Sequence, residues 1–444
     1  MLNLSLPKTA TAPFCPNEVG GTVTVPPSQN KWRKLLAFMG PGLLVAVGYM
    51  DPGNWATDIE GGAKFGYLLL SVIFLSNLMA MLLQSLCFRL GIVTGKDLAQ
   101  LCRQEFHPAL NFALWVFAEI AIIACDLAEL LGSALALKLL FHLPLVLGVA
   151  ITGLDIMLVL LLQGKGFRWL EAMVLGLIAT IGLCFLIEIA FSQPNWFAVA
   201  QGIVPRSQII RQPEMLYLAV SIIGATVMPH NLYLHSLIVQ TRSWQKSLLN
   251  PAQAIGYATL DSTLALVGAF FINASILIVA AATFHYSGNQ QVAEIEDAYR
   301  LLAPLLGTGL ASVLFGIALL ASGQSSTFTG TLAGHIVMEG FLDWWIPCWL
   351  RRLITRMLAI APALVGILIF GEQSVGKMLV LSQVVLSLQL PFAVIPLILF
   401  TGNRNIMGRF ANQRWLQTLA WLVALVITGL NIWLLGQIFS EIVT

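Results

Sequence analysis

The chain has 444 residues, of which 58% are hydrophobic and only 10% are charged. Soluble domains have about 25% charged residues, so this composition, with a mean hydropathy of +0.85, excludes a soluble protein and indicates a chain that lies in a bilayer. A net charge of +2 without a basic cluster predicts no nucleic-acid partner, and the six cysteines lack the spacing of a zinc site or a disulfide framework.

The amino-terminal segment 1–30 is rich in Pro, Thr, Ser and Asn and lacks the apolar stretch of a signal peptide, so we expect a disordered cytosolic tail. A span needs roughly 20 apolar residues, and the polar breaks after the tail are short. Several apolar stretches exceed this length and must tilt, kink or extend past the bilayer. The eleven predicted spans are Leu35–Phe65, Tyr67–Ile92, Leu110–Leu140, Leu143–Leu162, Trp169–Phe191, Met215–Gln240, Ala258–Tyr286, Leu301–Phe341, Leu353–Phe370, Met378–Thr401 and Trp415–Ile438.

The basic residues predict the orientation, because Lys and Arg gather in cytoplasmic loops. With the amino terminus inside, eleven spans put most of the 23 Lys and Arg residues on the cytoplasmic side, and one early span more or fewer would scramble this sorting. The carboxyl terminus is then external, and the compact loops favour a bacterial inner membrane. The exceptions on the outer side are Lys64, Lys138, Arg206, Arg211, Arg300 and Lys377.

Two tetrapeptides interrupt the first and the sixth span, each with Pro second and Asn fourth. Proline removes an amide donor and blocks a helical hydrogen bond, so each unwound turn frees backbone carbonyls at membrane depth. Paired breaks five spans apart are typical of a transporter built from inverted repeats, and ordinary proline kinks are the alternative. The two breaks are Asp51-Pro52-Gly53-Asn54 and Met228-Pro229-His230-Asn231.

The pattern predicts an all-α polytopic membrane protein with two repeats. We expect residues 31–192 to form the first repeat with spans one to five, and residues 193–402 to form the second with spans six to ten. Residues 403–444 would hold the eleventh span and the external carboxyl terminus.

The side chains at the two breaks predict a cation site. An ionised Asp51 near the bilayer centre costs roughly 2.5–3.5 kcal/mol, so it needs a cation partner. Asn54 lies one turn further on, Met228 adds a thioether, and the carbonyls of Gly48 and Ala225 precede the breaks. Mg²⁺ and Ca²⁺ take oxygen shells, whereas a mixed oxygen and sulfur set favours Mn²⁺, Fe²⁺ or Co²⁺. A flexible core filler is the alternative for the methionine.

These motifs resemble the paired signature of the natural resistance-associated macrophage protein (Nramp) family of proton-coupled metal transporters. The resemblance runs from about Lys31 to Ile438, nearly the whole chain. The further matching segments are Leu232–Ser236, Ala118-Glu119-Ile120, Cys125-Asp126-Leu127-Ala128-Glu129, Gly323–Thr327 and Leu381-Ser382-Gln383.

The resemblance implies a leucine-transporter-like fold of two inverted five-helix repeats plus an eleventh helix, with the first and sixth spans discontinuous. It implies import of Mn²⁺ or Fe²⁺ coupled to protons. We also expect a monomer without a cofactor. The metal ligands implied are Asp51, Asn54 and Met228, with backbone oxygen near Ala225 and help from Gln383.

Three carboxylates in the third span lie near one helical face, at spacings of seven and three residues. Glu119, Asp126 and Glu129 must face the bundle interior, because three acids in lipid would be intolerable. They predict either a proton relay or a static set of ion pairs with arginines at the start of the ninth span. These arginines are Arg351, Arg352 and Arg356.

The family resemblance favours the relay. It makes Asp51 the proton acceptor and leads the proton out through Asp126, Glu129 and at least one arginine. Arg356 is deepest in the ninth span, and Arg351 and Arg352 could be ordinary cytoplasmic residues.

His230 lies in the second break and His235 just after it, and histidine usually titrates near physiological pH. We expect them to tune coupling or gating rather than to bind metal, and a polar lining role is the alternative. The remaining acids near span ends are expected to be solvated charges at the mouths of the bundle. They are Glu188, Glu339, Asp343 and the residues Glu294–Asp297.

Two other functions compete with metal transport. A sodium-coupled carrier of amino acids uses helix amino termini to hold a substrate carboxylate, which Asp51 would repel. An intramembrane enzyme has no support, because the sequence contains no Gly-x-Ser-x-Gly or His-Glu-x-x-His motif.

Overall fold

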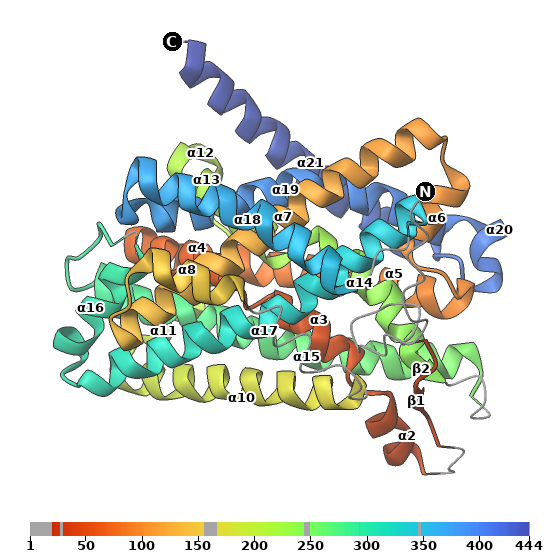
Figure 1. Cartoon of the computed structure of the whole chain (residues 1–444), viewed down its shortest axis with the longest axis horizontal. Helices are drawn as coiled ribbons and strands as arrows, with labels where there is room; N and C mark the ends of the chain where they lie inside the picture. The colour runs from red at the N-terminus through yellow and green to blue at the C-terminus, as the bar shows by residue number, and fades with distance from the viewer. Residues whose placement is uncertain are drawn as a thin grey trace.

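The computed structural model describes residues 20–26, 30–154, 167–243, 249–292, 294–344 and 348–443. Most of them lie in long helices that run side by side (Figure 1). Helix α10 (Phe167–Ser192) follows one edge of the bundle, and the carboxyl-terminal end of α21 (Arg414–Val443) projects away from it.

The first half of the chain contains both halves of the interrupted first span. These halves are α3 (Pro41–Gly48) and α4 (Pro52–Phe65). Before them comes α2 (Lys31–Phe38), and after them, besides α10, come the 3₁₀ turn η1 (Gly66–Leu69), α5 (Leu70–Thr94), α6 (Leu98–Glu105), α7 (Pro108–Phe141), α8 (Leu145–Gly153), α11 (Trp196–Gly202) and α12 (Gln208–Arg211).

The second half begins with the interrupted sixth span. Its elements are α13 (Pro213–Thr226), α14 (Pro229–Ile238), η2 (Val239–Thr241), α15 (Pro251–Ala280), the π-helical turn η3 (Ala281–His285), α16 (Ile295–Leu306), α17 (Gly309–Leu342), α18 (Cys348–Phe370), η4 (Glu372–Ser374), α19 (Val375–Gly402), α20 (Arg404–Met407) and η5 (Gly408–Phe410).

Within these described ranges, nine helices are long and apolar enough to cross a membrane. That count joins α4 and α5 into one continuous segment, Pro52–Thr94, and α3 and α8 are each too short to count alone. The helices follow the order of the eleven predicted spans. The second part of the predicted fourth span, from residue 155, lies outside the described residues.

Two predicted spans differ from the structure. The first span has the predicted break at Asp51 and an additional one that was not predicted, because Gly40 has a φ of 139° between α2 and α3. The eighth span begins at Gly309 and not at Leu301, because Gly307 ends α16 with a φ of 71°. Glycine is the residue that adopts such positive φ values without a steric cost.

The tail predicted over residues 1–30 has an ordered part toward its carboxyl-terminal end. Strand β1 (Val23–Thr24) pairs in parallel with β2 (Arg242–Ser243), which follows the sixth span. The side chains of Val23 and Val25 are buried, so this short segment gains apolar contacts that hold it. Residues 1–19 and 27–29 of the predicted tail lie outside the described part.

Helix α4 lies in the interior, where small residues let neighbouring helices approach it. A Cβ atom at Gly132 of α7 would overlap the ring of Pro52, and one at Gly62 would lie 2.6 Å from the carbonyl oxygen of Leu277 in α15. Helix α7 also packs along α17 and α19. The first break is therefore surrounded by protein on several sides, away from lipid.

We predict that Gly62→Ala lowers the stability of the protein in detergent by about 1–3 kcal/mol, because the added methyl group overpacks the contact between α4 and α15. The measurement is the thermal unfolding midpoint. Gly268→Ala is the matched control, because Gly268 is an exposed residue of α15 with nothing within 4 Å of its Cβ position. Equal midpoints for the two variants would contradict the tight packing.

Candidate metal site

The first break begins α4 with a helix cap that places a carboxylate in the interior. Asp51 is the N-cap and Pro52 the first helical residue, the position where the missing amide of proline costs least. The Asp51 Oδ1 atom accepts hydrogen bonds from the backbone nitrogen of Asn54 at 2.9 Å and from its Nδ2 atom at 2.5 Å. Both side chains are buried. The same cap that starts the helix thus fixes the acid and the amide beside each other.

The carbonyl groups freed at this break accept hydrogen bonds from side chains of α4, α15 and α17. The backbone carbonyl oxygen of Tyr49 accepts a hydrogen bond from Asn273 Nδ2 at 2.7 Å. The Met50 oxygen accepts from Trp55 Nε1 at 3.3 Å and from Ser322 Oγ at 2.5 Å. These partners satisfy polar groups that would otherwise be costly at membrane depth. Sequence reasoning missed all three, although Asn273 is a conspicuous amide in an apolar span.

The second break brings a carbonyl and a thioether to the interior. Helix α13 ends at Thr226 and α14 begins at Pro229, so Met228 lies in the unwound turn and is buried. The Ala225 oxygen accepts from Asn54 Nδ2 at 3.1 Å, which joins the two breaks. The Met228 sulfur lies 3.6 Å from Asn231 Nδ2.

Most of the predicted ligands meet at one place. Gln383 of α19 donates from Nε2 to Asp51 Oδ2 at 3.3 Å, so the acid, Asn54, the Ala225 oxygen and Gln383 form one continuous set of contacts. The predicted Gly48 oxygen has a different setting, since it accepts a hydrogen bond from the Asp51 backbone nitrogen at 3.3 Å. A half-turn of the Asn54 amide would direct its oxygen, instead of its nitrogen, toward this set, as a cation requires.

Several buried oxygen atoms around the breaks lack a hydrogen-bond partner within the described residues. Such atoms are uncommon in folded proteins and call for an explanation. No cluster of three His, Cys, Asp or Glu residues suited to a metal occurs in this part of the chain, so a cation here would depend on the mixed set of Asp, amide, carbonyl and thioether groups. The unpartnered oxygens are Asp58 Oδ2, Thr226 Oγ1, Asn231 Oδ1, Asn273 Oδ1 and Gln383 Oε1.

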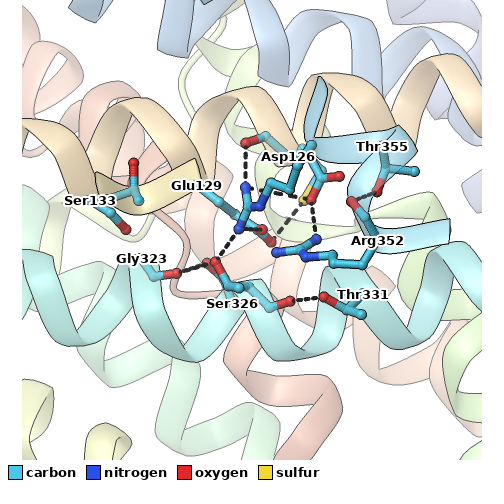
Figure 2. A network of polar contacts seen from close by, with 12 residues as sticks. Asp126, Glu129, Ser133, Gly323, Ser326, Thr331, Arg352 and Thr355 are labelled. Atoms are coloured by element: carbon cyan, nitrogen blue, oxygen red, sulfur yellow. Dashed lines mark hydrogen bonds and ion pairs between the residues drawn. The ribbon is translucent and has the colours of Figure 1, made fainter. Parts of the chain in front are cut away.

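The carboxylates of the third span face the bundle interior as predicted, and each has an arginine partner. Arg351 Nη2 lies 2.6 Å from Glu119, and Arg352 Nη1 lies 2.9 Å from Asp126. Figure 2 shows Asp126 and Glu129 of α7 beside Arg352, with Ser326 and Thr331 on the neighbouring α17.

The deepest arginine joins two of these acids. Arg356 lies 3.8 Å from Asp126 and 3.7 Å from Glu129, and it donates to Thr327 Oγ1 at 2.8 Å. The suggestion that Arg351 and Arg352 are ordinary cytoplasmic residues is wrong, because both are buried and ion-paired. Burial without a partner would cost each charge several kcal/mol.

The two histidines connect the breaks to neighbouring helices. His230 Nε2 lies 3.7 Å from the Cys125 sulfur, which lies 3.6 Å from Glu129 Oε1, so one thiol stands between the second break and the acids of α7. His235 Nδ1 lies 2.9 Å from Gln84 Oε1, and Gln84 donates to the Tyr49 hydroxyl at 2.9 Å. The sequence marked Cys125 only as part of a motif.

The acids expected to be solvated differ among themselves. Glu188 is fully buried and its two oxygens lack hydrogen-bond partners among the described residues, so that expectation is wrong for it. Asp343 is exposed and pairs with Arg103 at 2.9 Å. Glu294 is half-buried, accepts from the backbone nitrogen of Gly376 at 2.6 Å, and burial raises the pKa of its carboxyl to about 7.

Comparison with known proteins finds relatives that match most of the chain. A family model described as natural resistance-associated macrophage protein-like matches residues 42–437. A protein of Nostoc sp. named divalent metal cation transporter MntH is 65% identical over 420 residues, 95% of each chain. A protein of the same name from Ralstonia nicotianae is 57% identical and covers 98% of this chain and 99% of its own.

Solved structures agree with the sequence relatives. The Eremococcus coleocola manganese transporter superposes with a TM-score of 0.86 at 43% identity, over 93% of this chain and 89% of that one. Mhp1, a nucleobase-cation-symport-1 family transporter, has a TM-score of 0.57 at 12% identity over 97% and 96% of the two chains, which supports the fold alone. The chain has the leucine-transporter-like fold and belongs to the natural resistance-associated macrophage protein family, whose members are transporters and not enzymes.

Proposed function

We propose that this protein is a secondary transporter that imports divalent transition-metal ions, Mn²⁺ or Fe²⁺, into the cytoplasm by alternating access around the site between the two breaks. The observation that carries the proposal is the buried contact of Asp51 with Asn54 and of Asn54 with the Ala225 oxygen, which joins both breaks around one carboxylate. Relatives named divalent metal cation transporter and manganese transporter support the substrate class.

The ligand set explains the choice among divalent ions. Asp51, the Asn54 amide and the Ala225 carbonyl offer oxygen, which every divalent cation accepts. Met228 in the second break adds a sulfur atom, which binds transition ions better than Mg²⁺ or Ca²⁺. The site therefore distinguishes scarce transition metals from the abundant alkaline earths.

Proton coupling is the finer part of the proposal. Asp51 would accept the proton, and His230 of the second break lies beside Cys125, whose sulfur lies beside Glu129 of α7. Asp126 and Glu129 share Arg356, so a change of charge on one acid alters the pairing of the other. A static ion-pair set remains the competing function of these residues.

The setting of the transporter completes the proposal. From the distribution of Lys and Arg we infer a cytoplasmic amino terminus and an external carboxyl terminus. The compact loops favour a bacterial inner membrane, and a monomer is part of the same proposal. A carrier of organic solutes shares the fold, as the structure of MhsT with L-phenylalanine illustrates at a TM-score of 0.54 and 17% identity. Asp51 disfavours such a substrate, since it would repel a carboxylate.

We predict that Asp51→Ala abolishes Mn²⁺ uptake into proteoliposomes, because it removes the one acidic ligand of the proposed set. Uptake is followed with a metal-sensitive dye inside the vesicles. Asp343→Ala is the matched control, because this acid is exposed, lies away from the two breaks and forms its ion pair with Arg103. Wild-type uptake by the Asp51 variant would refute the site.

We predict that Met228→Ala retains part of the Mn²⁺ uptake and gains Ca²⁺ uptake, because an oxygen-only set no longer selects against alkaline earths. The measurement is the ratio of initial rates for the two ions, which should change by at least about tenfold. If Ca²⁺ is rejected as strongly as before, sulfur is not the selective ligand.

We predict that Mn²⁺ uptake acidifies the vesicle interior, because metal and proton enter together. A pH-sensitive dye inside the vesicles records the proton during a Mn²⁺ pulse, and a protonophore that dissipates the change is the control. Uptake of Mn²⁺ at an unchanged internal pH would identify a uniporter and leave the carboxylates of α7 with a structural role.

A further inference from the structure

A second buried carboxylate lies close to the proposed metal site and has no part in it. Asp58 is four residues beyond Asn54 on α4, so it lies on a similar face about 6 Å further along the helix. Its side chain is 1% exposed, and no hydrogen bond or ion pair to it occurs among the described residues. With the amino terminus inside, α4 runs outward, which puts Asp58 on the outer side of Asn54.

A buried hydroxyl group on α13, the helix that faces α4, also lacks a hydrogen-bond partner among the described residues. The position of a Cβ at Gly61 lies 3.9 Å from Cδ1 of Ile222, which brings α4 against α13. Thr226 lies one turn after Ile222, and Asp58 lies one turn before Gly61 and Gly62, so both approach the same contact from the inner side. Thr226 Oγ1 is buried and also lacks a partner.

The two unpartnered groups are hard to explain by packing alone. An ionised Asp58 has no counter-charge in the described structure, and its buried Oδ2 atom accepts no hydrogen bond there. A buried polar group left unsatisfied in this way costs about 1–3 kcal/mol or more. A cation that arrives with part of its water shell would satisfy the carboxylate directly and the hydroxyl through water.

We propose that Asp58 and Thr226 form an outer staging site that holds a partly hydrated divalent cation before it reaches Asp51. This inference rests on the proposed transport function and adds a second binding position to it. The staging site contains oxygen donors alone, so it accepts Ca²⁺ as well as Mn²⁺. Selection then takes place one step further in, where Met228 supplies sulfur.

The test is Asp58→Asn, which keeps the shape of the side chain and removes its charge. We expect the KM for Mn²⁺ uptake to rise about tenfold at an unchanged maximal rate, because a negative charge on the path of a cation raises its local concentration and its association rate. Competitive inhibition by external Ca²⁺ should weaken by a similar factor, which a merely structural role of Asp58 would not produce. Thr226→Val should raise the KM in the same direction, by about threefold, and it serves as the second variant should Asp58→Asn fail to fold.

Glu188→Gln is the matched control. Glu188 is also fully buried and unpartnered among the described residues, but it lies on α10, and the staging site does not include it. An unchanged KM in Glu188→Gln beside a raised KM in Asp58→Asn supports the proposal. A wild-type KM and wild-type Ca²⁺ inhibition in Asp58→Asn, or an equal rise in both variants, overturns it. Absence of Mn²⁺ uptake by the wild-type protein would instead overturn the transport function on which the staging site rests.

Discussion

The cap that Asp51 forms at the start of α4 is the interaction on which the site depends. A helix that starts inside a membrane protein leaves amide groups without partners, and an acidic N-cap satisfies them while its charge gains from the helix dipole. Pro52 follows where its missing amide is harmless, and Asn54 binds the same carboxylate with its backbone and its side chain. One local device therefore breaks the helix, orients the acid and brings the amide to it.

The surrounding side chains stabilise this break by donating hydrogen bonds to the freed carbonyl oxygens. Asn273 of α15, Ser322 of α17 and the indole of Trp55 donate to the oxygens of Tyr49 and Met50. The unwound turn is thus tied to two other helices, and its geometry cannot change without changing their hydrogen bonds. The second break is tied in less directly, through the Asn54 contact with the Ala225 oxygen.

The buried acids lie in two regions that differ in whether an arginine balances their charge. On α7 and α18, every carboxylate of the third span has a buried arginine, so the net charge of that region is near balance. On α4, Asp51 has amide donors and Asp58 has no partner among the described groups. The region around α4 therefore offers negative charge to a mobile cation, while the ion pairs of α7 and α18 do not. Cys125 and His230 stand at the border between the two.

Features that depend on a single helix could be predicted from the sequence, and contacts between helices could not. The two breaks were predictable, because proline acts on its own helix and needs no knowledge of neighbours. The inward face of the third span was also predictable, because charge in lipid is costly. Partners across helices could not be predicted. The pairing of Arg351 with Glu119 depends on how α7 and α18 pack, and the burial of Glu188 depends on the neighbours of α10.

The start of the eighth span at Gly309 was missed because Gly307 ends a helix within a stretch whose composition stays apolar. Asp58 shows the same limit most clearly, since an acid one turn past a ligand is visible in the sequence, but its lack of a partner is a property of the folded bundle alone.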